Sequence, residues 1–160
     1  MQLLKAMPTS RQTTIGLFLI RLVLGTIFIA HGAQKLFAIG VANFSAGLEQ
    51  MGVPAAGVMG PLVVLAELGG GIALVLGLFT RVAGLGVIAV MTGAIALVHY
   101  PNGFFAPDGF EFNLMLMAAA IGLIVMGAGA WSVDAMLARG ADRDTSSQTT
   151  AREERAARAA

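Results

Sequence analysis

Seven polar side chains interrupt stretches of sequence that are otherwise apolar. They are Arg21, His31, Lys35, Glu67, His99, Glu111 and Asn113. A charged group at the centre of a bilayer costs about 2.5–3.5 kcal/mol on insertion scales, so each of these side chains needs a partner or a function. A buried carboxylate or imidazole can be tuned to titrate near neutral pH, which suits proton exchange with a bound molecule.

The spacing of these residues predicts that several of them meet. At about 100° of turn per residue, Arg21, His31 and Lys35 fall on one face of the first apolar stretch. Glu67 shares its face of the second stretch with a stripe of glycines, which allows close helix packing. At about 1.5 Å of rise per residue, Glu67 lies about 12 Å and His31 about 8 Å below the outer boundary, and Arg21 lies deeper. We therefore expect Glu67 to pair with His31 or Lys35.

The remaining polar residues predict where such a site would open. His99 and Glu111 lie at the outer ends of their apolar stretches, and Asn113 lies just below. We expect a pocket open toward the outer face. A structural interpretation stays open beside this one: Glu67 could merely fix helix packing, and Arg21 could extend its charge to the cytoplasmic interface.

The elements that must position these residues are four apolar stretches. They cover 15–36, 59–79, 82–98 and 112–131, near the 17–25 residues that a transmembrane helix requires. The chain is 57% hydrophobic and only 12% charged, which excludes an ordinary soluble domain. We predict an all-α fold: an integral membrane bundle of four transmembrane helices in up-down topology. A short surface helix is expected within 43–52.

Basic residues predict the orientation of this bundle. Lys5 and Arg11 precede the first stretch, Arg81 lies between the second and third, and several arginines follow the fourth, whereas the connections 38–58 and 99–111 contain no Lys or Arg. Both termini are therefore expected in the cytoplasm. The predicted organisation is a cytoplasmic N-terminus over 1–14, a membrane domain over 15–137 and a disordered cytoplasmic tail over 138–160. Because Arg21 interrupts the first stretch, we interpret it as a retained span and not a signal peptide.

Other chemistry has little support in the sequence. The chain contains no cysteine, so thiolate ligands and dithiol relays are excluded. No single predicted helix carries His or carboxylate residues at metal-ligand spacing, so no metal site is predicted. Basic residues without interleaved aromatic residues give no nucleic-acid signal.

Several motifs, in order, give the chain a resemblance to a known family. The blocks are Arg21–Gly25, His31–Phe37, Gly52–Pro54, Glu67–Gly71 and Leu76–Arg81, followed by His99, Gly103–Phe105, Glu111, Gly127–Gly129 and Asp134. Together they resemble the DoxX family of small bacterial and archaeal membrane proteins, from Arg21 to about Leu137. The resemblance implies a four-helix protein of the bacterial inner membrane, of a type described as an oxidoreductase. Some family members are subunits that pass electrons from sulfur compounds to the quinone pool, and others are linked to quinones or oxidative stress.

The leading hypothesis is a membrane subunit of an oxidoreductase system that binds a quinone-like or other small hydrophobic substrate. Glu67 and His31 would exchange protons with it, and Arg21, Lys35 and Asn113 would bind it. His99 and Glu111 would gate the pocket. The cofactor is open, with a quinone as the candidate, and so is catalysis by this chain alone. The expected partners are the lipid bilayer, a redox subunit and a second copy of the chain. Two alternatives are a small transporter or efflux component and a non-catalytic scaffold for a soluble redox partner.

Overall fold

A computed structural model describes residues 9–141 of the chain, and this part contains helices and turns but no strand. The helices are α1 (Ser10–Ala33), α2 (Val41–Gln50), α3 (Ala56–Leu76), α4 (Thr80–Ala94) and α5 (Glu111–Met126), followed by a helix over 133–141. Three shorter segments join them: the π-helical η1 (Gln34–Ile39) and η2 (Ile95–His99), and the 3-10 helix η3 (Tyr100–Asn102).

Helices α1 and α3 pack with their backbones unusually close, at Gly25 and Gly32 of α1 and Gly71 of α3. A Cβ added to Gly25 would lie 2.7 Å from the carbonyl oxygen of Gly71, and one added to Gly32 would lie 2.6 Å from the amide nitrogen of Leu68. Real Cβ atoms cannot approach backbone atoms so closely, so glycine is required at this interface. The rest of the core is apolar and connects α1, α3, α4 and α5 through Leu24, Phe28, Leu74, Val87, Ala120 and Leu123.

Three helical stretches are long and apolar enough to cross a membrane: Ser10–Ile39, Ala56–Leu76 and Thr80–Asn102. The fourth, α5, is apolar but has 16 residues, which gives about 24 Å at 1.5 Å per residue. The predicted span 112–131 was therefore too long. The helix ends at Met126 because Gly127 takes a φ of 81°, which is outside the helical region.

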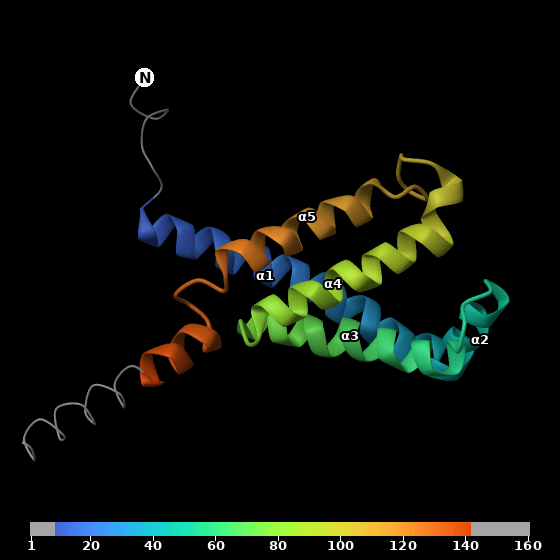
Figure 1. Cartoon of the computed structure of the whole chain (residues 1–160), viewed down its shortest axis with the longest axis horizontal. Coiled ribbons are helices and arrows are strands. Elements are labelled where there is room, and N and C mark those ends of the chain that lie inside the picture. Colours follow the sequence, from blue (N-terminus) through green and yellow to red (C-terminus); the bar gives the residue numbers. More distant parts are fainter. Residues whose placement is uncertain (1–8, 142–160) are drawn as a thin grey trace, which may run out of the picture.

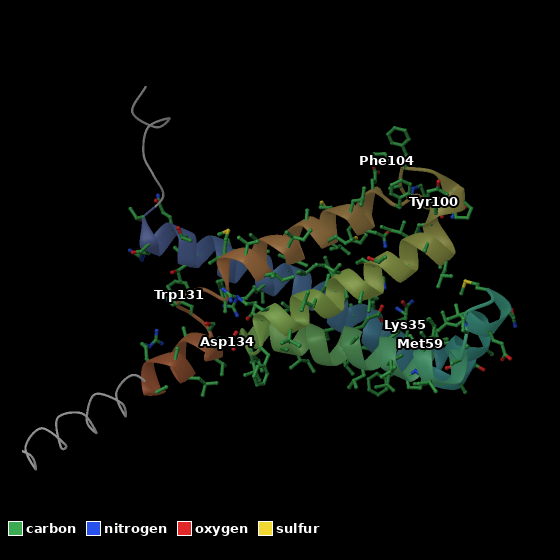
Figure 2. All side chains as sticks on the ribbon, in the orientation of Figure 1. Lys35, Met59, Tyr100, Phe104, Trp131 and Asp134 are labelled. Atoms are coloured by element: carbon green, nitrogen blue, oxygen red, sulfur yellow. The ribbon has the colours of Figure 1, made fainter. Side chains whose placement is uncertain are left out.

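Different helices and side chains lie at the two ends of the bundle. Figure 1 shows that α1 begins, and the helix over 133–141 ends, at the same end of the bundle, whereas α2 lies at the opposite end. In Figure 2, Trp131 and Asp134 lie at the first end, and Lys35, Tyr100 and Phe104 lie toward the other.

Two predicted segments can be compared with the structure. The helix expected within 43–52 is present as α2, over Val41–Gln50. Its position on the membrane surface stays a prediction. The predicted disordered tail began at residue 138, but residues 133–141 are helical. The rest of that tail, 142–160, lies outside the described residues.

Candidate functional site

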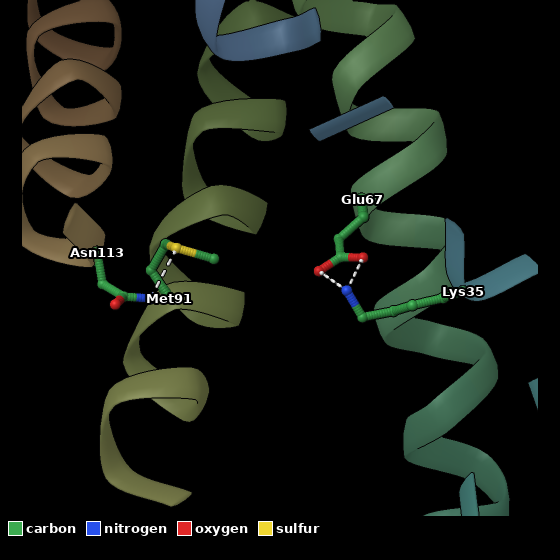
Figure 3. A network of polar contacts seen from close by, with 4 residues as sticks. All are labelled: Lys35, Glu67, Met91 and Asn113. Atoms are coloured by element: carbon green, nitrogen blue, oxygen red, sulfur yellow. Dashed lines mark hydrogen bonds and ion pairs between the residues drawn. The ribbon is translucent and has the colours of Figure 1, made fainter. Parts of the chain in front are cut away.

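Lys35 and Glu67 form an ion pair inside the bundle (Figure 3). Lys35 Nζ donates a hydrogen bond to Glu67 Oε1 at 2.9 Å and lies 2.7 Å from Oε2. The lysine side chain is 15% exposed and the glutamate side chain 5%. The π-helical segment η1 carries Lys35, and the middle of α3 carries Glu67. Of the two partners predicted for Glu67, the structure selects Lys35.

The pair lies on the wall of a cavity of about 310 Å³, which we call the polar cavity. Its polar lining residues are His31, Lys35, Glu67, His99 and Asn113. These are five of the seven residues singled out by the sequence, and they come from α1, η1, α3, η2 and α5. Apolar residues of α1, α4 and α5, including Phe28, Met91 and Leu116, cover the remaining wall. The volume lies at the lower end of the range for small-molecule sites, about 300–1,000 Å³.

The two histidines of the polar cavity differ in how they are held. His31 is an exposed side chain on the cavity wall. His99 Nδ1 lies 2.8 Å from the backbone oxygen of Asp108. A carbonyl oxygen only accepts hydrogen bonds, so neutral His99 carries its proton on Nδ1, and Nε2 is left as an acceptor.

Asn113 and Met91 form the wall opposite the ion pair, as Figure 3 shows. Asn113 is buried, and its side-chain nitrogen donates to the sulfur of Met91 at 3.4 Å. Sulfur is a weak acceptor. This amide could therefore exchange that contact for a hydrogen bond to a ligand carbonyl at small cost.

Sequence reasoning missed the two π-helical segments, although both carry residues of the cavity. Lys35 lies in η1, and His99 is the last residue of η2. π-helical turns insert an extra residue into a helix and occur frequently at functional sites. The only local signal near η1 is Gly40, whose φ of 83° ends the segment.

Two predicted site residues are outside the polar cavity. Glu111 accepts a hydrogen bond from the backbone N–H of Ala106 at 2.8 Å, and so holds the loop before α5. Arg21 is 0% exposed, and it donates to the backbone oxygens of Leu74, at 3.2 Å, and of Trp131. Arg21 therefore does not line the polar cavity, and its guanidinium is held by backbone oxygens. Its predicted role in substrate binding stays a prediction.

Beyond Arg21, the same end of the bundle is tied together by Asp134. Its carboxylate accepts hydrogen bonds from the backbone N–H groups of Phe79, at 2.7 Å, and Thr80, at 3.0 Å, where α4 begins. Burial opposes ionisation of Asp134, but these hydrogen bonds and the charge of Arg21 outweigh it, so its pKa is lowered from the usual 3.8. Asp134, which the sequence analysis named only as part of a family motif, thus joins the α3–α4 turn to the C-terminal segment.

Within residues 9–141, no group of three or more His, Cys, Asp or Glu side chains could hold a metal ion. The polar cavity instead offers an ammonium donor, a carboxylate, two imidazoles and an amide. This set can donate hydrogen bonds to carbonyl oxygens and exchange protons with a bound molecule.

Comparisons with known proteins agree with this architecture. The chain is 33% identical over 134 residues to the uncharacterized membrane protein Rv3486 of Mycobacterium tuberculosis, covering 75% of this chain and 80% of that protein. It is 34% identical over 125 residues to the inner membrane protein YqjF of Escherichia coli, covering 77% and 92%. A third relative, 29% identical over 127 residues and covering 79% and 90%, is named "putative oxidoreductase CatD" in Bacillus subtilis. No solved structure matches the chain.

The family model that matches is DoxX, over residues 16–100. The matched range contains four of the five polar residues that line the polar cavity: His31, Lys35, Glu67 and His99. With this match over more than half of its length, and with membrane proteins as its relatives, the chain is a membrane protein of the DoxX family.

Proposed function

We propose that the protein crosses the bacterial inner membrane four times, in up-down order, with both ends in the cytoplasm. Arg11, Arg81 and Arg139 lie at the end of the bundle where α1 starts and the α3–α4 turn is anchored. The opposite end carries acidic residues, Glu49 and Asp108. The positive-inside rule assigns the basic end to the cytoplasm. Helix α5 is short for a span, which local thinning of the bilayer accommodates at modest cost.

The polar cavity, in this proposal, binds a quinone-like molecule, and the protein serves as a membrane subunit of an oxidoreductase system. The cavity is lined by one cation and one carboxylate, so its formal charge is zero with neutral histidines. Such a site suits a neutral head group with carbonyl oxygens better than an anion. The ammonium of Lys35 and the amide of Asn113 would donate to those oxygens. The relative named as an oxidoreductase supports a redox role.

The chemistry assigned to the chain is proton exchange. Reduction of a quinone to a quinol takes up two electrons and two protons per molecule, and the electrons come from a partner subunit or soluble donor. When a quinone oxygen gains charge, Lys35 stabilises it, and Glu67 and His31 are the groups on the cavity wall that hold and release protons. His99, with Nε2 free to accept, would relay protons at the cavity mouth.

One observation carries the proposal: the Lys35–Glu67 pair borders a cavity. Charged side chains inside a membrane are rare, and those that border a cavity mark sites for substrates, ions or protons. Here the pair shares its cavity with two imidazoles and an amide, which is the composition of a site that handles protons.

The test compares Glu67→Gln with a matched control, Glu49→Gln, which alters an exposed carboxylate on α2. Both variants and the original protein are placed in lipid nanodiscs, and binding of a naphthoquinone is measured. We expect Glu67→Gln to weaken naphthoquinone binding about tenfold, since it removes both the carboxylate and the ion-pair partner of Lys35. We expect Glu49→Gln to leave the binding unchanged. Absence of binding by the original protein, or equal binding by both variants, would overturn the proposal.

A further inference from the structure

A second cavity, of about 320 Å³, adjoins the polar cavity; we call it the apolar cavity. It lies between α2, α3 and the α4–η2 helix, and its distinctive lining residues are Phe44, Leu48, Met51, Met59, Val63 and Leu97. Lys35, Glu67, Ala94 and His99 line both cavities. The ion pair is therefore part of the wall that the two cavities share.

The rim of the apolar cavity faces the surroundings of the bundle with apolar side chains. Met51, Met59 and Leu97 line it and are exposed. In Figure 2, Met59 and Lys35 are both labelled toward the α2 end of the bundle. In a membrane, an opening framed by exposed apolar side chains admits hydrocarbon and excludes water, because the lipid tails are as apolar as these residues. An occupant of this cavity is thus expected to be a flexible apolar chain.

The ammonium of Lys35 lies near residues of both cavities. Its ammonium lies 2.7 Å from Glu67 Oε2 and 5.4 Å from the ring centroid of Phe44, which belongs to the apolar cavity. A lysine side chain has a long flexible stem, so the ammonium can move between partners. A ligand oxygen in the polar cavity could therefore take up this ammonium, which lies in the wall that the two cavities share.

We propose that the two cavities form one site for a single amphiphile, with a neutral quinone-type ring in the polar cavity and an isoprenoid tail in the apolar cavity. The inference rests on the proposed function and extends it by assigning a tail-binding site on α2, α3 and α4. An anionic phospholipid such as phosphatidylglycerol is disfavoured as occupant, because its head group has a net negative charge, whereas the shared lining has one positive and one negative side chain.

The test fills the apolar cavity from Gly93 on α4, which lines it and where an added Cβ meets nothing within 4 Å. The variant is Gly93→Leu, and the matched control is Gly86→Leu. Gly86 lies two turns earlier on the same helix, is equally open to a Cβ, and lines neither cavity. Two probes are compared in nanodiscs: a naphthoquinone with an isoprenoid tail, and the same ring without the tail.

Because lipid and cavity are equally apolar, the expected effect of Gly93→Leu is steric exclusion of the tail. We expect binding of the tailed probe to weaken about tenfold or more in Gly93→Leu, with the tail-less probe unaffected and Gly86→Leu normal for both. Equal binding of the tailed probe by the two glycine variants would overturn the tail site. Failure of the tail-less probe to bind the original protein would instead overturn the proposed function.

A direct measurement covers the case in which Gly93→Leu fails to fold. A probe with a photoreactive group at the end of its tail is bound to the original protein, and the labelled peptides are identified by mass spectrometry. Labels on residues of the apolar cavity, such as Leu48 or Met59, are expected. Labels spread over the outer faces of α1 and α5, or displacement of the probe by phosphatidylglycerol, would contradict the inference.

Discussion

At the scale of single residues, the two buried charges of the bundle have different roles. Glu67 meets Lys35 beside a cavity, whereas Arg21 is fully enclosed and donates to backbone oxygens. By bonding to Leu74 in the last turn of α3 and to Trp131 after α5, Arg21 ties these two parts of the chain together. A carboxylate and an ammonium that border a cavity can still exchange partners with a ligand.

The anchor at Asp134 gives a prediction about stability and pH. Asp134→Asn should lower the Tm, since an amide has one acceptor oxygen for the two N–H groups at the start of α4; loss of such a cap costs about 1–2 kcal/mol. Phe79 adds to the effect, because its φ of 47° is unfavourable for a residue with a side chain and depends on this anchor. Fluorescence of Trp131, the single tryptophan, follows unfolding close to the change.

The sign of the pH dependence follows from the lowered pKa. Asp134 contributes its stability above the unfolded-state pKa of 3.8 and loses it as the pH falls through the lower folded-state value. The Tm difference between the original protein and Asp134→Asn should therefore be full at neutral pH and shrink below about pH 3.8. Asp108→Asn is the control, because the backbone of Asp108, and not its carboxylate, makes the contact to His99. A Tm difference that is constant down to acid pH would contradict this role.

At the scale of elements, the α1–α3 interface sets the distance across which Lys35 and Glu67 meet. Gly71 lies one turn after Glu67, and a Cβ there would lie 2.7 Å from the amide nitrogen of Ile29 on α1. The π-helical η1 then carries Lys35 toward α3. Close helix contact and an irregular helix end thus together position the pair.

Gly71→Ala should therefore push the two helices apart. We expect a loss of about 1–3 kcal/mol, the usual cost of overpacking, and weaker naphthoquinone binding. Gly70→Ala is a matched control, because a Cβ at Gly70 meets nothing within 4 Å, and alanine is the better helix former. Thermal unfolding in detergent measures both variants. Equal stability of the two would show that the helices do not depend on this contact.

At the scale of the whole molecule, the distribution of basic residues supports the proposed orientation. The basic α3–α4 turn, the start of α1 and the helix over 133–141 share one end of the bundle, held together by Arg21 and Asp134. The polar cavity lies toward the opposite end, where η1, η2 and the start of α5 contribute Lys35, His99 and Asn113 to its lining. In the proposed orientation, a ligand would therefore enter from the outer half of the membrane.

The proposed topology can be tested by cysteine labelling, because the chain has no native cysteine. Gln50→Cys at the end of α2 and Gly140→Cys in the last helix are both exposed positions. In intact cells, a membrane-impermeant maleimide should label Gln50→Cys, and should label Gly140→Cys only after the membrane is opened. Labelling of both cysteines in intact cells would contradict the four-span arrangement.

Sequence by itself determined the class of this protein, the three long apolar helices and the helix at Val41–Gln50. Hydropathy and helical periodicity are local properties, and a bilayer admits few other backbone structures. The sequence also singled out the polar residues of the cavity, because charged side chains within apolar membrane-spanning stretches are energetically costly. Tertiary structure alone decided that Glu67 pairs with Lys35, that Arg21 is an enclosed structural cation, and that α5 ends at Met126. These three features depend on the distance between neighbouring helices and on the rotation of each helix about its axis. They also depend on π-helical turns, which the periodicity of the sequence does not predict.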